Sequence, residues 1–171
     1  METWDAIRSR RNVRSYAEEA IAPEDLDRIL EAGRRSPSAG NGQPWDFVVC
    51  TDRDQLGQLA RVWRSAGHVA RSAATIALVA PVPDDIRGSD LVQHDLGQAT
   101  MSIMLAAADL GIGSAHAAVS DQALARRLLG FPEDRFCAWL IALGVPADRP
   151  LTPVRQPNRR PFAEVVHRGH W

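Results

Sequence analysis

The sequence predicts an α+β or three-layer α/β domain, and two kinds of segment support this fold class. Short apolar runs typical of buried strands occur at residues 45–50, 74–79, 111–119 and 136–143. Between them lie segments with apolar residues three and four positions apart, which predict five or six helices. The chain has 171 residues, so we expect a single domain over residues 1–171.

Capping residues mark where the predicted helices begin. Thr3 precedes a short helix to about residue 10, and Pro23, followed by two acidic residues, is typical of a helix start. Asp52 can cap a third helix whose apolar stripe includes Trp63, and Ser120 can cap a later one. Helices therefore alternate with strands along much of the chain.

A long helix is predicted from about residue 90 to 110. Its second half is apolar on nearly every face, so we expect a central core helix or a subunit interface. After residue 144, five prolines make the chain too proline-rich for regular structure, before a short apolar stretch at 162–166.

The charge composition excludes several classes of protein. All 20 basic residues are arginine, and 21 acidic residues bring the net charge to −1. Without lysine, the chain cannot form a Schiff base, complete a Walker A loop or act as a Ser-x-x-Lys hydrolase. The near-neutral charge argues against nucleic-acid or membrane binding, and neither a signal peptide nor an 18-residue apolar run is visible. We therefore expect a cytoplasmic protein.

Metal and disulfide chemistry are not indicated. The two cysteines, Cys50 and Cys137, form no Cys-x-x-Cys pair. His167 and His170 have a spacing that could hold a metal ion, but no third ligand is indicated. We expect no metal site.

An arginine cluster near the N-terminus is the first candidate site. Arg8, Arg10, Arg11 and Arg14 fall within seven residues, and the guanidinium fork matches phosphate oxygens in pairs. The alternative, favoured for such a cluster taken alone, is a solvated basic edge.

Two further segments could line a ligand site. The turn-forming run 36–45 would let backbone N–H groups approach a ligand, and Asn41 and Gln43 could bond a heterocycle edge. Its alternative is a helix-to-strand connection with Trp45 filling the core. His116 follows a Gly-x-Gly that comes after a helix rather than a strand, so a Rossmann loop is excluded. A structural role for this histidine is favoured over general acid–base catalysis.

Four runs, taken in order, resemble the nitroreductase family of flavin enzymes. They are RRNVRSY, SPSAGNGQPWDFVV, LAAADLGIGSAHAAV and NRRPFAEVVHRGHW. The second is the most specific match, and together the runs span nearly the whole chain. The resemblance implies an α+β (three-layer α/β/α) fold with a mixed, mainly antiparallel sheet flanked by helices. It also implies a C-terminal extension that wraps the partner subunit of a homodimer.

The resemblance further implies an FMN-dependent oxidoreductase. Such an enzyme transfers hydride from NADH or NADPH to bound FMN and then to nitroaromatic, quinone or related small-molecule acceptors, by a ping-pong mechanism. The flavin carries the chemistry, so no catalytic protein residue is expected.

Site residues follow from the same match. Arg10 and Asn12 would bind the FMN phosphate and ribityl chain, with Arg11 in the same run. Arg14 would face the N1 and O2 edge of the flavin, where a cation stabilises the charge that reduction adds. Residues expected from the partner subunit are Pro37, Ser38, Ala39, Asn41 and Gln43. The backbone of His116, Ala117 and Ala118 would approach flavin N5, and Arg159 or Arg160 would reach the phosphate.

The chain departs from the family pattern at several positions. Asn12 replaces a serine, Tyr16 replaces a phenylalanine, and His116 lies where many members have tryptophan. The 50-residue interval between Trp45 and Asp95 leaves little room for the helices that shape the acceptor pocket in longer members, so we expect a more open pocket.

Other hypotheses remain open at this point. The chain could be a flavin carrier or sensor without turnover, and a deazaflavin could replace FMN. An RNA-binding basic patch is disfavoured, because no aromatic residues interleave the arginines and the net charge is not positive.

Overall fold

A four-stranded sheet forms the centre of the protein in the computed structural model, which describes all residues 1–171. The strands are β1 (Asp46–Cys50), β2 (Ala74–Pro81), β3 (Gly113–Ala118) and β4 (Arg135–Gly144). Their order across the sheet is β1-β2-β4-β3, and all three neighbouring pairs are antiparallel. The predicted strand runs are confirmed, whereas the expectation of a mixed sheet is corrected, because no two strands pair in parallel.

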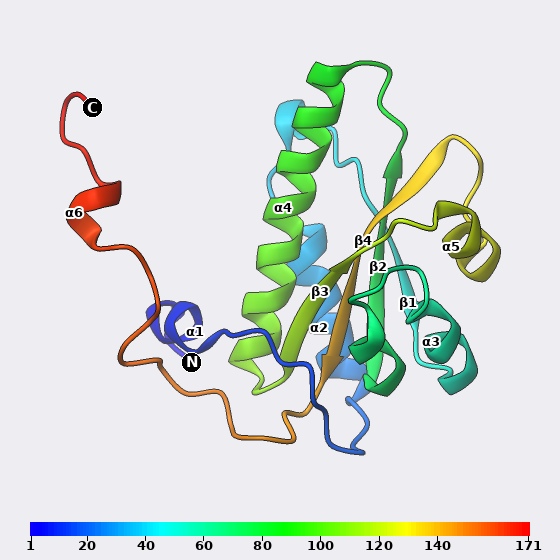
Figure 1. The fold of residues 1–171 in the computed structure, drawn as a ribbon, viewed down its shortest axis with the longest axis horizontal. Helices are drawn as coiled ribbons and strands as arrows, with labels where there is room; N and C mark the ends of the chain where they lie inside the picture. Colours follow the sequence, from blue (N-terminus) through cyan, green and yellow to red (C-terminus); the bar gives the residue numbers. More distant parts are fainter.

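Helices cover both faces of the sheet, as Figure 1 shows. The helices are α1 (Thr3–Ser9), α2 (Pro23–Arg34), α3 (Arg53–Leu59), α4 (Ile86–Asp109), α5 (Gln122–Leu129) and α6 (Phe162–Val165), with 3-10 turns η1 (Ala39–Asn41) and η2 (Gly67–Arg71). Helices α2 and α4 lie on one face, and α3 and α5 on the other. The α+β fold with helices on both faces of the sheet is therefore confirmed.

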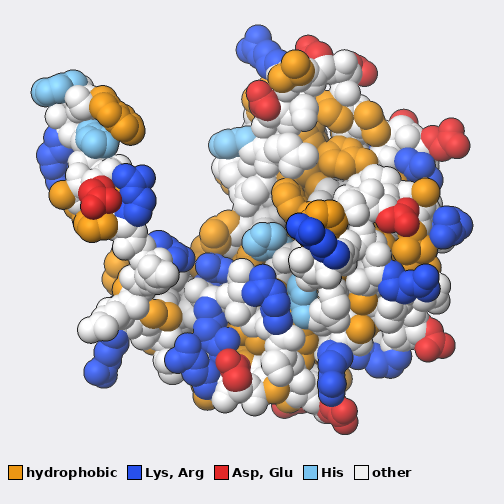
Figure 2. Space-filling view, viewed as in Figure 1, with side chains coloured by type: hydrophobic (Ala, Val, Ile, Leu, Met, Phe, Trp, Pro, Cys, Tyr) orange, Lys and Arg blue, Asp and Glu red, His pale blue; other side chains and the backbone are white.

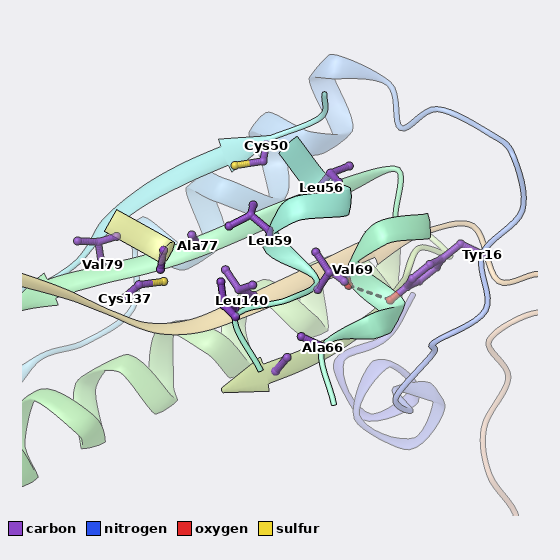
Figure 3. Close-up of a cluster of buried hydrophobic side chains, with 14 of the residues drawn as sticks. Tyr16, Cys50, Leu56, Leu59, Ala66, Val69, Ala77, Val79, Cys137 and Leu140 are labelled. Atoms are coloured by element: carbon purple, nitrogen blue, oxygen red, sulfur yellow. Dashed lines mark hydrogen bonds between the residues drawn. The ribbon is translucent and has the colours of Figure 1, made fainter. Parts of the chain in front are cut away.

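Each face has its own apolar core. On the face that α3 and α5 cover, Leu56 and Leu59 of α3 pack with Val69 of η2 (Figure 3). On the face that α2 and α4 cover, Ile103 of α4 packs with Ile29 of α2. Alternate residues of β2 point into the two cores, as a sheet covered on both faces requires.

Local capping explains several helix boundaries. The Asp52 carboxylate accepts the Gln55 N–H at 2.8 Å, which confirms the predicted start of α3. Helix α3 ends at Leu59, so Trp63 lies beyond the helix rather than on its stripe. The residue that caps α5 is Asp121, not Ser120. Helix α4 begins at Ile86, four residues earlier than predicted.

The N-terminal segment after α1 lies across the ends of β3 and β4. Val13 N–H donates to the Ser114 carbonyl at 2.9 Å, and the Tyr16 hydroxyl donates to the Val13 carbonyl at 2.6 Å. Two glycines allow this close approach. A Cβ at Gly113 would lie 2.7 Å from Val13, and one at Gly144 would lie 2.7 Å from the Tyr16 ring. We call residues 12–17 the N-terminal strap.

The C-terminal segment extends away from the rest of the chain (Figure 1). Every residue from 152 to 171 is exposed. Most of it lacks regular structure, as predicted, but one turn of helix, α6, forms within it. Its links to the body include the Val154 N–H, which donates to the Arg8 carbonyl at 3.0 Å. No helix in the structure has the length and apolar character needed to cross a membrane.

Candidate functional site

The strap brings Arg14 alongside His116. Asn12 forms a parallel bridge with Ser114. Arg14 lies close enough to His116 on β3 for its charge to lower the pKa of that imidazole, and both side chains are exposed. Sequence runs about 100 residues apart thus meet at the edge of the sheet.

A cavity of about 930 Å³ opens between α1, α4 and the C-terminal segment. Five arginines line it: Arg8, Arg10, Arg11, Arg155 and Arg159. No aspartate or glutamate is among its lining residues. Figure 2 shows the same concentration of arginine side chains where the C-terminal segment leaves the body. We call this the arginine cavity.

The arginines of this cavity differ in how they are paired. The Arg11 guanidinium contacts the Asp148 carboxylate at 2.7 Å and the Arg149 carbonyl at 2.9 Å. Arg10, by contrast, forms no ion pair and donates to the Asn12 side-chain oxygen at 3.3 Å. Arg8 also has a carboxylate partner, Asp5, at 3.6 Å. Guanidiniums that have no such partner, as at Arg10, are suited to an anion with several oxygens.

The imidazole of His116 is held mainly in its neutral form. Partial burial lowers its pKa from the usual value of 6.5, and the charges of Arg14 and Arg10 lower it further. The ring packs edge-on against Trp139, with 5.9 Å between ring centroids. A neutral imidazole is a poor proton donor near pH 7, which agrees with a structural role.

His68 is a residue of this region that sequence reasoning missed. Both of its ring nitrogens are buried, and neither has a partner with good hydrogen-bond geometry. Burial lowers its pKa, and so do the charges of Arg14 and His116, while backbone groups of Ala115 and Ser65 oppose the shift. A lone histidine in a 3-10 turn carries no periodic signal, so only the fold reveals it.

The turn-forming loop 36–43 lies beside α4, away from the arginine cavity. Its backbone is unusual, because Asn41 and Gln43 have positive φ angles of 56° and 48°. Such angles are uncommon outside glycine and persist where the surroundings hold them. The Ser38 hydroxyl accepts the Gln43 N–H at 2.9 Å, which closes the loop on itself.

Three polar residues of α4 hold this loop. The buried Asp95 carboxylate accepts the Ala39 N–H at 3.2 and 3.1 Å. Gln98 donates to the Pro37 carbonyl at 3.3 Å. The Ser102 hydroxyl accepts a hydrogen bond from Ser36 at 2.8 Å. Positions 95, 98 and 102 share one helix face, and we call them the α4 polar stripe. These contacts join residues 56 to 66 positions apart in the chain, so no local sequence pattern reveals them.

The predicted site residues thus form three groups within one chain, with Arg160 apart from them. Arg10, Arg11, Asn12 and Arg159 line the arginine cavity. His116, Ala117 and Ala118 are consecutive residues of β3, and Arg14 of the strap lies close enough to His116 to lower its pKa. The loop residues Pro37, Ser38, Ala39, Asn41 and Gln43 line no part of that cavity. Arg160 is likewise absent from its lining and donates to the Glu164 carbonyl at 3.0 Å.

Comparison with known proteins identifies the family of this chain. The sequence profile described as "Nitroreductase family" matches residues 7–84. A protein of Archaeoglobus fulgidus, named as a candidate NADH dehydrogenase/NAD(P)H nitroreductase, is 32% identical over 174 residues, which cover 99% of each chain. The chain belongs to the nitroreductase family. It is an enzyme of that family, and an FMN reductase [NAD(P)H] of Bacillus subtilis is 25% identical over 92% of this chain and 71% of its own.

Solved structures of this family share the fold. A Parabacteroides distasonis protein, a candidate NADH dehydrogenase/NAD(P)H nitroreductase, superposes with a TM-score of 0.84 at 26% identity, over 100% of this chain and 99% of its own. An FMN-dependent nitroreductase of Clostridium difficile superposes with a TM-score of 0.84 at 21% identity, over 97% and 98% of the chains. The fold of this nitroreductase-family chain is thus the family fold along almost its whole length.

Proposed function

We propose that this nitroreductase-family enzyme binds FMN and transfers hydride from NADH or NADPH through it to nitroaromatic, quinone or related acceptors, in a ping-pong cycle. The observation that supports the proposal most strongly is the arginine cavity, with five guanidiniums and no carboxylate in its lining. A phosphate monoester is the part of FMN that this donor set fits. When bound, FMN supplies a ring that accepts and returns a hydride.

The chain's own residues would bind and orient the flavin. Arg10 and Asn12 would hold the phosphate and ribityl chain, and Arg159 would approach the phosphate from the C-terminal segment. Arg14 would lie at the N1 and O2 edge, where its charge favours the reduced state. The backbone of β3 at His116 would lie near N5 and support the ring.

We further propose that two copies of the chain complete each site. The loop 36–43 does not reach the arginine cavity of its own chain, so it would line the flavin site of the partner. The exposed C-terminal segment, with Phe162 and Trp171 70% and 97% exposed, would cover apolar surface of the second subunit.

The visible spectrum of the purified protein tests this function. Purified protein should be yellow, should lose its colour anaerobically with NADPH or NADH, and should regain it when a quinone is added. Bleaching without reoxidation by any acceptor would favour a flavin carrier. Failure to bind either FMN or a deazaflavin would contradict the proposal.

A further inference from the structure

We propose that Asp95 is a positioning residue for the cofactor, because its carboxylate holds the loop 36–43 in the shape that the flavin site requires. This inference rests on the proposed function, in which that loop lines the flavin site of the partner subunit. Nothing in the sequence motifs draws attention to Asp95. The case for it comes from its burial, its bonding partners and the backbone it restrains.

Asp95 is the only charged residue among the buried polar side chains, at 3% exposure. No arginine contacts it. The charge is met instead by the Ala39 N–H at both oxygens, by Gln98 at 3.4 Å and by the mostly exposed His94 ring at 3.4 Å. A buried carboxylate without a cationic arginine is costly unless its hydrogen bonds are kept. This cost ties the position of Ala39 to that of α4.

The restrained backbone is under strain. Gly40, Asn41 and Gln43 all have φ angles between 48° and 56°. Two of them are not glycine, and such conformations persist only where surrounding contacts determine them. Strain of this kind is concentrated at ligand clamps and switch regions. The carboxylate bond at Ala39 begins the strained stretch, so it is the contact best placed to maintain it.

The α4 polar stripe extends this restraint along the helix. Gln98 and Ser102 fix the chain before Ala39, at Pro37 and Ser36. Helix α4 is 24 residues long and packs in the apolar core through Ile103 and Leu96. A long buried helix is a rigid base, so the loop is held in a single arrangement before any ligand arrives. Binding then loses less conformational entropy.

The test compares FMN affinity in Asp95→Asn and Asp95→Ala with that of the wild type. Asp95→Ala removes both acceptor oxygens and should release the loop, whereas Asp95→Asn keeps one oxygen for the Ala39 N–H and should weaken the contact less. We expect the FMN dissociation constant of Asp95→Ala, from fluorescence titration of the full-length protein well below its Tm, to rise at least tenfold. Asp52→Ala is the matched control. It also removes a carboxylate that accepts a backbone N–H, yet it should lower Tm without changing FMN affinity.

Two outcomes would overturn the inference while leaving the proposed function intact. One is a folded Asp95→Ala variant that binds FMN within twofold of the wild type. The other needs no variant. If the Ala39 amide of the wild-type protein, without cofactor, exchanges with deuterium as fast as an unstructured amide, the carboxylate does not hold the loop. If the wild type itself binds no flavin, the proposed function fails instead.

Discussion

Arg10 and Arg14 lie four residues apart but occupy different places at the residue scale. Arg10 lines the arginine cavity without a carboxylate partner. Arg14 lies beside the strand residue His116 and influences the pKa values of His116 and His68. Loss of each side chain should therefore have a different signature.

We expect Arg10→Ala to weaken FMN binding roughly tenfold to a hundredfold, because a charge-assisted contact contributes about 1.5–3 kcal/mol. Arg14→Ala should weaken binding and also lower the flavin reduction potential, since the cation near N1 would be lost. Fluorescence titration measures the FMN affinity, and potentiometry measures the reduction potential.

Arg127→Ala, on the exposed side of α5, is the control and should alter neither the affinity nor the potential. An unchanged potential in Arg14→Ala would refute the placement of Arg14 at N1.

His116 should prove dispensable as an acid. Its pKa is lowered from the usual value of 6.5 by partial burial and by the charges of Arg14 and Arg10, so little of the acidic imidazolium is present at neutral pH. We expect His116→Gln to keep turnover within about tenfold, whereas loss of a general acid typically costs about 10²–10⁴-fold.

Stopped-flow reoxidation of the flavin by one quinone, from pH 5 to 9, provides the measurement. The reoxidation rate of the wild type should show no step near pH 6–7 that is lost in His116→Gln. A hundredfold loss in His116→Gln at unchanged FMN occupancy would instead assign the residue a catalytic role.

At the scale of elements, the strap depends on Gly113. A methyl group at this position would lie 2.7 Å from Val13, so Gly113→Ala should displace the strap and Arg14 with it. Overpacking costs about 1–3 kcal/mol, which corresponds to a fall in Tm of roughly 2–12 °C. FMN affinity should fall as well.

Gly57→Ala gives the matched comparison for calorimetry. Gly57 lies in α3, and no atom lies within 4 Å of the point that an added methyl group would occupy. Alanine there should stabilise the helix by about 0.5–1 kcal/mol. Equal Tm values for Gly113→Ala and the wild type would show that the strap has room to move.

Elements that depend on local patterns were predictable from the sequence. The four strand runs and the Asp52 cap rest on residues close together in the chain, and the structure confirms them. The docking of the strap onto β3, a contact across about 100 residues, has no local pattern. The role of Asp95 also escaped, because its partner Ala39 is 56 residues away. It remains a prediction which residues of the three groups bind flavin.

At the scale of the whole molecule, several large apolar side chains are exposed, and we expect a second copy of the chain to cover them. Trp4 and Ile7 of α1 are 66% and 47% exposed, beside the exposed Met101 of α4. The C-terminal segment adds Phe162. We expect light scattering at micromolar concentration to give twice the chain mass of 18.7 kDa, because obligate dimers often lack a stable folded monomer. A mass of one chain would contradict both the dimer and the shared site.

The strap also sets when the protein can acquire its function during synthesis. Its residues leave the ribosome early, yet the Ala17 N–H donates to the Val145 carbonyl, far later in the chain, at 2.9 Å. At roughly 5–20 residues per second, translation needs on the order of ten seconds to supply that partner. Until then the strap, and the arginines that precede it, have no complete sheet edge to lie against. A nascent chain stalled before β4 should therefore be unable to assemble the arginine cavity, although its N-terminal arginines have already been synthesised.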